Sequence, residues 1–223
     1  MEAAPRRFSA LVFGASGAVG SEVTKQLLAN ALWNPVYLVV RSLTPALNAL
    51  AANPNVRLVV CPEVVNPVTL TEALKDAKID AVFNFLGSQT KHGKEAFIHV
   101  DKTLVVQSAE FALSLKANHF VHVTSMGADA NSMFLYMKTK GQCENELQKI
   151  PIENVVVYRP GLLVDRKDAR FVEKIGSWVP FLNKIKTEDL AKRIAAKTLA
   201  DLQTSQKAGF KIIPHSEITK IRV

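Results

Sequence analysis

Residues 8–28 read FSALVFGASGAVGSEVTKQLL and place Gly14, Gly17 and Gly20 between an apolar run and an amphipathic one. Every glycine costs backbone entropy on folding, so this cluster indicates a place where bare backbone is needed. In a strand–turn–helix unit the first glycine permits the tight turn, the second lets backbone approach a pyrophosphate, and the third lets helix and strand pack closely. We therefore expect a nucleotide-binding turn here, with a purely structural turn as the alternative.

The rest of the chain repeats this alternation of apolar runs and helical stretches. Continuous runs rich in β-branched residues are typical of strands that are buried on both faces of a sheet. The expected strands cover residues 8–13, 36–40, 56–60, 80–87, 119–125, 153–161 and 210–214. The expected helices cover residues 20–32, 66–77, 94–117 and 132–150, and a last helix precedes the final strand. This order predicts an α/β protein with a doubly wound parallel sheet of the Rossmann type, whose ligands bind beyond the carboxyl ends of the strands.

Length and composition are those of a single globular domain. The chain has 223 residues, so we expect one domain over 1–223, with residues 165–205 as an irregular, variable part. The net charge is +8, but the lysines are scattered among carboxylates, which favours solvated helix faces over a nucleic-acid surface. Cys61 and Cys143 are the only cysteines and suggest no disulfide framework, so we expect a reducing, cytoplasmic location. No apolar run approaches the ~20 residues of a membrane span, and we expect no secretory signal.

The residue that follows the second expected strand bears on the choice of dinucleotide. An NAD-binding protein offers an Asp or Glu about 20 residues after the glycine turn, where it binds the adenosine ribose. This chain has Arg41 in that place. A guanidinium suits a 2′-phosphate through charge-assisted hydrogen bonds. Arg41 therefore predicts NADP(H), with an ordinary surface arginine as the alternative.

Three residues further along the chain suit the chemistry of carbonyl reduction. Ser125 ends an expected strand, and Tyr136 and Lys140 are four apart, so they share one face of a helix. A free tyrosine has a pKa of about 10, and a neighbouring ammonium favours its phenolate. Tyr136 would act as general acid and base, Lys140 would tune it and bind ribose hydroxyls, and Ser125 would orient the carbonyl. The alternative is a half-buried tyrosine beside a surface lysine.

Several motifs carry a family resemblance. They are GASGAVG (14–20), VRS (40–42), NFLGSQTKHGKEAF (84–97), VTSMGAD (123–129), FLYMKTKGQCENEL (134–147) and YRPGLLVDR (158–166). Over roughly residues 8–215 the chain resembles the short-chain dehydrogenase/reductase superfamily, in the atypical, NmrA-like branch that contains the Tat-interacting oxidoreductase and its fungal relatives. The resemblance implies that NADP(H) is bound by Gly14, Ser16, Gly17, Ala18, Val19, Gly20, Arg41, Ser42, Phe85, Leu86, Gly87, Tyr136, Lys140, Leu162 and Arg170.

The chain departs from the superfamily pattern at one position. Many members carry an asparagine in the helix after the fourth strand, where it completes a proton relay, but this chain has Asp101 near that place. The fourth member of the catalytic set is therefore open. His119 and His122 face opposite sides of their expected strand and cannot converge on a metal, so we expect no metal site.

Residues 171–186 form an aromatic and basic stretch with three interpretations. Its apolar members are Phe171, Ile175, Trp178, Val179, Phe181 and Leu182, and its lysines are Lys174, Lys184 and Lys186. The stretch could pack in the core, close as a lid over an apolar substrate, or contact an anionic membrane or a protein partner.

Two functions follow from these residues. The first is an NADP(H)-dependent oxidoreductase that transfers hydride between nicotinamide and a small carbonyl or alcohol substrate, with Tyr136 moving the proton. The second is a regulatory or redox-sensing protein that binds NADP(H) and acts through protein partners with little turnover. Members of the branch that the chain resembles are known more as regulators than as enzymes with settled substrates. The sequence leaves the oligomeric state open.

Overall fold

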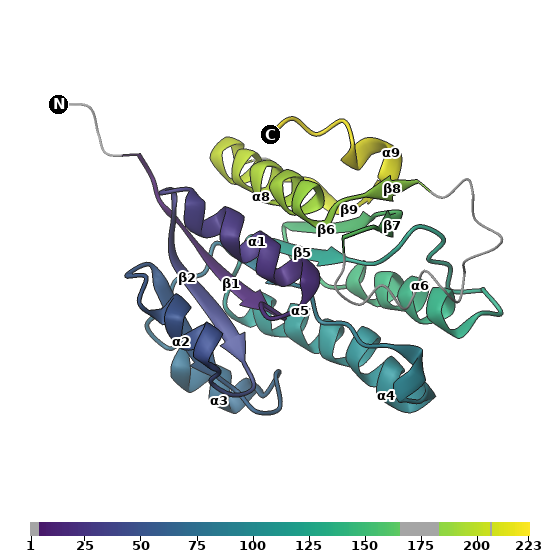
Figure 1. Ribbon diagram of the computed structural model, residues 1–223, viewed down its shortest axis with the longest axis horizontal. Helices are drawn as coiled ribbons and strands as arrows, with labels where there is room; N and C mark the ends of the chain where they lie inside the picture. The colour runs from purple at the N-terminus through teal and green to yellow at the C-terminus, as the bar shows by residue number, and fades with distance from the viewer. Residues whose placement is uncertain (1–4, 166–182, 206) are drawn as a thin grey trace.

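A single parallel sheet organises the molecule (Figure 1). The computed structural model describes residues 5–165, 183–205 and 207–223. In these residues seven strands lie in the order β3-β2-β1-β4-β5-β6-β9, and every neighbouring pair is parallel. The strands are β1 (Phe8–Phe13), β2 (Trp33–Val40), β3 (Val56–Val60), β4 (Ala81–Asn84), β5 (His119–Val123), β6 (Asn154–Arg159) and β9 (Gly209–Pro214). The predicted doubly wound Rossmann-type fold is confirmed.

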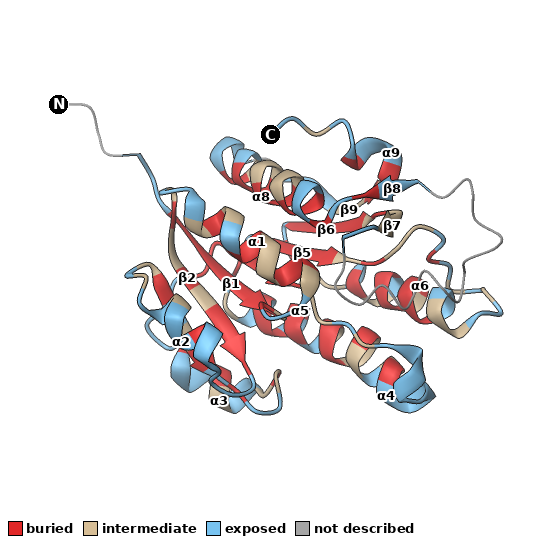
Figure 2. Cartoon of the chain, viewed as in Figure 1, coloured by how far each residue is buried: buried red, intermediate tan, exposed pale blue. Residues whose placement is uncertain are grey.

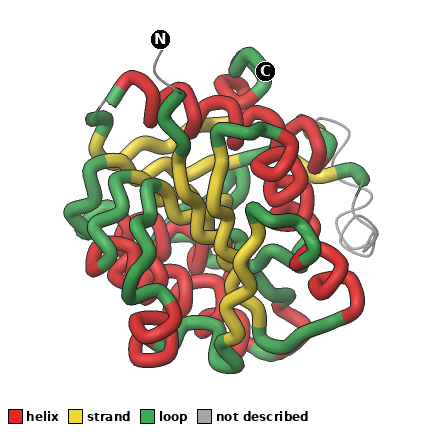
Figure 3. The backbone as a smooth tube through the Cα atoms, turned by 90° about the vertical axis from the view of Figure 1, so that its left-hand side faces the viewer, coloured by secondary structure: helices red, strands yellow, loops and turns green. Residues whose placement is uncertain are grey.

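Helices cover both faces of this sheet, and the strands run through the middle of the molecule (Figure 3). The helices are α1 (Ala18–Ala29), α2 (Pro45–Ala51), α3 (Pro67–Ala73), α4 (Lys94–Ile98), α5 (Leu104–Ser114), α6 (Leu135–Leu147), α8 (Thr187–Thr204) and α9 (His215–Ile218). Short 3₁₀ and π-helical segments, η1 (Thr90–His92) and η2 (His99–Thr103), flank α4, and a small second sheet pairs β7 (Leu162–Leu163) with β8 (Lys184–Ile185). None of the helices in the described part of the chain is long and apolar enough to cross a membrane.

The core is split into two layers by the sheet. One layer joins α1, α2, α8 and α9 to alternate strand residues such as Val12 and Phe83, and the other joins α3, α5 and α6 to their neighbours, such as Phe13 and Val82. The central strands are buried throughout, while the helices expose their outer faces (Figure 2). Each fully buried side chain of this size contributes about 1.5–3 kcal/mol. This two-sided burial explains why the strands read as continuous apolar runs in the sequence.

The structure refines three expectations. Helix α2 was not expected, although Thr44 caps it and Pro45 opens it, as Asn66 and Pro67 do for α3. The helix expected over 94–117 is interrupted by η2. Within the range 165–205, the helix expected before the final strand is α8, which packs on α1, and residues 166–182 lie outside the described residues.

The start of α1 lies unusually close to the end of β1. A Cβ atom added to Gly20 would stand 2.1 Å from the carbonyl oxygen of Gly14, which is far inside van der Waals contact. Gly14 itself has φ +76°, and a Cβ there would meet the backbone carbon of Phe85 at 2.7 Å. Bare backbone at Gly20 therefore lets the helix pack directly on the turn, and bare backbone at Gly14 lets the segment after β4 pack on it as well.

We expect Gly20→Ala to lower the free energy of unfolding by about 1–3 kcal/mol, because the added methyl group collides with fixed backbone. Gly87→Ala is the matched control, since a Cβ there would meet only Asp101 Oδ1 at 3.6 Å, an ordinary contact. Chemical denaturation of the two variants measures the difference. Equal stability of both variants would contradict the close packing of α1 on the turn.

Candidate functional site

The N-terminus of α1 is open at the turn after β1. Ser16 and Gly17 are exposed, and no side chain in the described residues caps the helix. By contrast, the side chains of Thr44 and Asn66 cap the N-termini of α2 and α3. The first turn of α1 also contains no acidic residue. The first backbone N–H groups of α1 and the positive end of its dipole are thus left for water or an anion. Gly14, Gly17 and Gly20 form a cradle that fits a diphosphate.

Two other loops reach the same edge of the sheet. Phe13 pairs with Val39 on one side and with Asn84 on the other, so the residues that follow these strands leave the sheet side by side. Arg41 and Ser42 follow β2, and both are exposed. Arg41 makes no ion pair with any described residue. Arg41 thus follows β2 at the edge of the sheet where the turn after β1 lies.

The segment Phe85–Leu86–Gly87 follows β4 and closes the other side of the cradle. The Phe85 N–H donates to the carbonyl of Phe13 at 3.0 Å, and the Leu86 N–H donates to Asn84 Oδ1 at 3.0 Å. These bonds hold the segment against the turn at Gly14. The expected cofactor residues between Gly14 and Gly87 are therefore brought to one edge of the sheet, where the strand order reverses between β1 and β4.

The three residues expected to carry chemistry lie on β5 and α6. Ser125 stands two residues beyond the end of β5, and its Oγ is buried with no hydrogen-bond partner among the described residues. Tyr136 is half-buried on the first turn of α6 and stacks on Phe97 with ring centroids 5.8 Å apart. Lys140 follows one turn later on the same face. A buried hydroxyl without a partner in this part of the chain is costly and suits a bound oxygen atom.

Lys140 is held by the residue that departs from the family pattern. Its Nζ lies 2.8 Å from Asp101 Oδ1, and both side chains are almost fully buried. The backbone N–H and hydroxyl of Ser88 donate to Asp101 Oδ2 at 2.7 and 2.9 Å. Burial alone would lower the pKa of Lys140, but the attraction of Asp101 and of Tyr136 raises it above its ordinary value. Lys140 is therefore a firmly protonated cation whose charge Asp101 compensates.

Asp101 owes its position to an irregular helical turn. It lies in the π-helical segment η2, between α4 and α5. A π-helical turn inserts one residue into an α-helix and rotates the side chains that follow, and such turns are frequent at functional sites. The sequence shows Asp101 near the asparagine position, but the period of the hydrophobic pattern carries no sign of this turn. The sequence also gives no sign of Ser88, because its part in the site is to donate to Asp101 in this turn.

The histidines on β5 lie inside the molecule. Both are buried, and His122 donates from Nδ1 to the carbonyl of Asn84 at 2.9 Å. Burial, with a further contribution from Lys140, lowers the pKa of His122 to about 3, so it is neutral at pH 7. Within the residues that the structure describes there is no group of three His, Cys, Asp or Glu that could hold a metal ion.

Two cofactor residues expected from the resemblance lie further along the chain. Leu162 is half-buried in β7, and its N–H donates to the carbonyl of Asn183 at 2.9 Å. Arg170 lies outside the described residues, as do the apolar members of the stretch 171–186 from Phe171 to Leu182.

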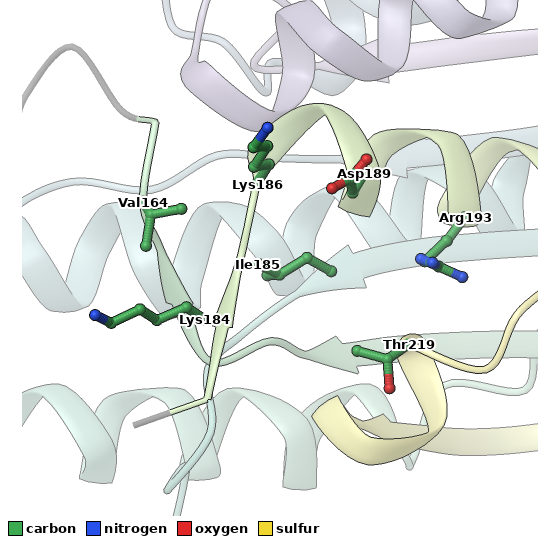
Figure 4. Close-up of a pocket in the computed structure, with 7 residues that line it drawn as sticks. All are labelled: Val164, Lys184, Ile185, Lys186, Asp189, Arg193 and Thr219. Carbon is green, nitrogen blue, oxygen red and sulfur yellow. The ribbon is translucent and has the colours of Figure 1, made fainter. Parts of the chain in front are cut away.

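A cavity of about 260 Å³ lies next to β7, between β8, α8 and α9 (Figure 4). Lys184, Lys186 and Arg193 line it, but Figure 4 shows their charged ends spread around Ile185 rather than converging. The N-terminus of α8 is already occupied by Asp165, which accepts from the Thr187 N–H at 2.7 Å. This cavity therefore lacks the features of a phosphate site.

Comparisons with known proteins agree with this geometry. Residues 14–201 match the NAD(P)H-binding family. The chain is 34% identical over 165 residues to protein HTATIP2 of Rattus norvegicus, a match that covers 73% of this chain and 66%, just under two thirds, of the rat protein. It is 31% identical over 180 residues to the mitochondrial protein FMP52 of Candida albicans, covering 76% of each chain.

Solved structures share the fold. A short-chain dehydrogenase/reductase from Burkholderia thailandensis superposes with a TM-score of 0.72 at 19% identity, over 96% of this chain and 94% of that one. A UDP-glucuronic acid 4-epimerase from Bacillus cereus, solved with UDP-glucuronic acid and NAD, gives a TM-score of 0.65 at 18% identity, over 93% and 77% of the two chains. The fold and the glycine cradle define a nucleotide-binding protein of the Rossmann type. The chain belongs to the NAD(P)H-binding family.

We expect Asp101→Ala to lower the free energy of unfolding by about 3–5 kcal/mol, because it leaves the Lys140 ammonium buried without a counter-ion. Asp101→Asn should be milder, since its amide oxygen can still accept from Ser88. Glu72→Ala is the control, because its ion pair with Lys75 is exposed and such surface changes stay within about 0.5 kcal/mol. Urea denaturation measures all three. A loss in Asp101→Ala no larger than in Glu72→Ala would refute the buried pair.

Proposed function

We propose that this protein is an NADP(H)-dependent oxidoreductase acting on an apolar carbonyl or alcohol. The observation that carries the proposal is the convergence of the glycine cradle, the orphaned Ser125 hydroxyl and the Tyr136–Lys140 pair at one edge of the sheet. The chain's membership of the NAD(P)H-binding family supports the cofactor class. The guanidinium of Arg41 favours the 2′-phosphorylated form.

Each residue has a distinct role in this proposal. The N–H groups at the start of α1 bind the diphosphate, and Arg41 binds the 2′-phosphate. When bound, the nicotinamide supplies or accepts hydride. Ser125 would donate its hydroxyl hydrogen to the substrate carbonyl and orient it, and Tyr136 would give its proton to the carbonyl oxygen. An ammonium has three N–H donors, so Lys140 keeps two for ribose hydroxyls after its contact with Asp101.

The surroundings of Tyr136 favour an apolar substrate. Met133 and Phe134, directly before α6, are 99% and 71% exposed. Met137 lies on the first turn of α6. Large apolar side chains gathered around a candidate active site are typical of surfaces that bind apolar groups.

One observation favours the second function, an NADP(H)-binding regulator with little turnover. Asp101 compensates the charge of Lys140, so the buried pair adds little net positive charge next to the general acid of the proposed reaction. A protein with this arrangement can bind cofactor firmly and still transfer protons slowly. Such a protein would act by binding a protein partner with an affinity that depends on whether the cofactor is bound.

Tyr136→Phe distinguishes the two functions. If the protein is an enzyme, turnover of a carbonyl panel, followed by nicotinamide absorbance, should fall about 10²- to 10⁴-fold, because the general acid is lost. NADPH affinity should change by less than about tenfold, the value of one hydrogen bond. Wild-type protein that binds NADPH but turns over no carbonyl would favour the regulator.

Arg41→Ala tests the choice of cofactor. We expect NADPH affinity to fall about 10- to 100-fold, because a charge-assisted hydrogen bond to the 2′-phosphate is lost, while NADH affinity stays constant. Arg57→Ala is the matched control: Arg57 is an exposed arginine of β3 that donates to the carbonyl of Pro54, before the strand. Calorimetric titration gives the dissociation constants. An unchanged NADPH-to-NADH ratio in Arg41→Ala would show that Arg41 does not bind the phosphate.

A further inference from the structure

A second cavity, of about 200 Å³, is lined by the two residues that directly follow Ser125 in the chain. Met126 and Gly127, which directly follow Ser125, form one wall, and residues 214–216 at the end of β9 form another. The Met126 N–H donates to the carbonyl of Pro160 at 2.8 Å and so ties this wall to the end of β6. The cavity therefore lies at the carboxyl ends of β5, β6 and β9, next to the proposed position of the substrate carbonyl.

Arg159 contributes a fixed hydrogen-bond donor to this cavity. Its guanidinium is bound by both carboxylate oxygens of the buried Glu144, through Nε at 2.9 Å and through Nη2. Thr124 holds Glu144 in turn, by donating from Oγ1 to Oε1 at 2.6 Å. Glu144 and Thr124 thus fix the orientation of the guanidinium plane. The remaining nitrogen, Nη1, has no hydrogen-bond partner among the described residues.

His215 contributes a second donor. The residue is only 8% exposed, and its Nδ1 accepts a hydrogen bond from the Gly161 N–H at 3.0 Å. Because Nδ1 accepts, the ring hydrogen of the neutral imidazole stands on Nε2. Burial lowers the pKa of His215, which keeps the ring neutral at pH 7. Nε2 makes no hydrogen bond within the described part of the chain, although His215 lines the cavity.

The charges around the cavity disfavour an anion. Glu144 compensates Arg159 directly, and Asp129 acts on the same guanidinium: the hydrogen bond to Glu144 raises the pKa of Arg159, and the charge of Asp129 adds to that effect. Two carboxylates therefore oppose one guanidinium, while Met126 and Pro214 supply apolar wall. A neutral oxygen on an apolar body matches this combination of donors, charge and wall.

We propose that this cavity is a substrate subsite that receives a neutral hydrogen-bond-acceptor oxygen, such as a second keto or hydroxyl group, at the end of the substrate remote from the reacting carbonyl. The proposal rests on the proposed function for its place in catalysis, because it assumes that Ser125 holds the reacting carbonyl. Arg159 Nη1 and His215 Nε2 are the two donors. The substrate class becomes an apolar carbonyl compound that carries a second oxygen, rather than a plain hydrocarbon ketone.

The test is a binding comparison of three small probes by NMR, with and without NADPH. Cyclohexanone has an acceptor oxygen, methylenecyclohexane has the same shape without one, and cyclohexanecarboxylate carries a charge. We expect cyclohexanone to bind about 3- to 10-fold more tightly than either of the others, the value of one hydrogen bond, and to shift the amide signal of Ser216. Equal binding of the three probes, or no shift at Ser216, would overturn the subsite.

Two variants of His215 separate its nitrogen atoms. His215→Asn keeps an acceptor for the Gly161 N–H and removes the outer donor, so the preference for cyclohexanone should fall to less than about half. His215→Gln places an amide N–H near Nε2 and should keep the preference. An unchanged preference in His215→Asn would overturn the assignment of Nε2. The wild-type comparison stands without either variant, should one fail to fold.

NADPH oxidation with cyclohexane-1,4-dione, a carbonyl compound that carries the second oxygen, is measured in parallel. Its absence together with the expected probe preference contradicts the proposed reductase but leaves the subsite intact. Turnover without any probe preference contradicts the subsite and leaves the reductase intact.

Discussion

The close approach of α1 to the end of β1 is the constraint on which the site depends. Because the backbone of Gly20 lies against the Gly14 carbonyl, the open N-terminus of α1 points at the carboxyl edge of the sheet. The strand order then brings the loops after β2 and β4 to the same place. A side chain at Gly20 would push the helix away from the turn, and one at Gly14 would push away the segment after β4, so the loops would no longer face a common ligand.

The buried pair of Lys140 and Asp101 gives this fold an unusual electrostatic balance. In the proposed mechanism Lys140 serves both the cofactor and the phenol of Tyr136, and the two tasks respond differently to a counter-ion. Binding ribose hydroxyls needs N–H donors, which the pair leaves available, whereas favouring a phenolate needs net positive charge, which Asp101 reduces. Asp101 also accepts two hydrogen bonds from Ser88, so it links the segment after β4 to Lys140 on α6. In that mechanism, cofactor binding and proton transfer therefore place different demands on Lys140.

The parts of the fold that repeat a local pattern could be predicted from sequence. Buried parallel strands read as apolar runs, and Gly14, Gly17 and Gly20 mark the turn because their requirement for bare backbone is local. Helix α2 could also have been found, because Thr44 and Pro45 repeat the start signal of α3 at Asn66 and Pro67. These features depend on neighbours in the chain.

The remaining features depend on contacts between distant residues. The contact of Asp101 with Lys140 requires the π-helical turn η2, which leaves no trace in hydrophobic periodicity. The donors of the second cavity come from Arg159 and His215, which are adjacent only because β6 pairs with β9. Likewise, Ser125 is recognisable from its place after a strand, but the lack of a partner for its Oγ in the described residues is visible only in three dimensions.

The most direct test of the account follows the backbone amide signals of Gly17, Ala18 and Val19 while NADPH is added to the purified protein. If bare N–H groups at the start of α1 hold the diphosphate, these signals move with a saturable dependence on NADPH, and signals at the amino ends of the strands stay in place. NADPH that fails to bind, or that binds and leaves these three amides unmoved, would contradict the account.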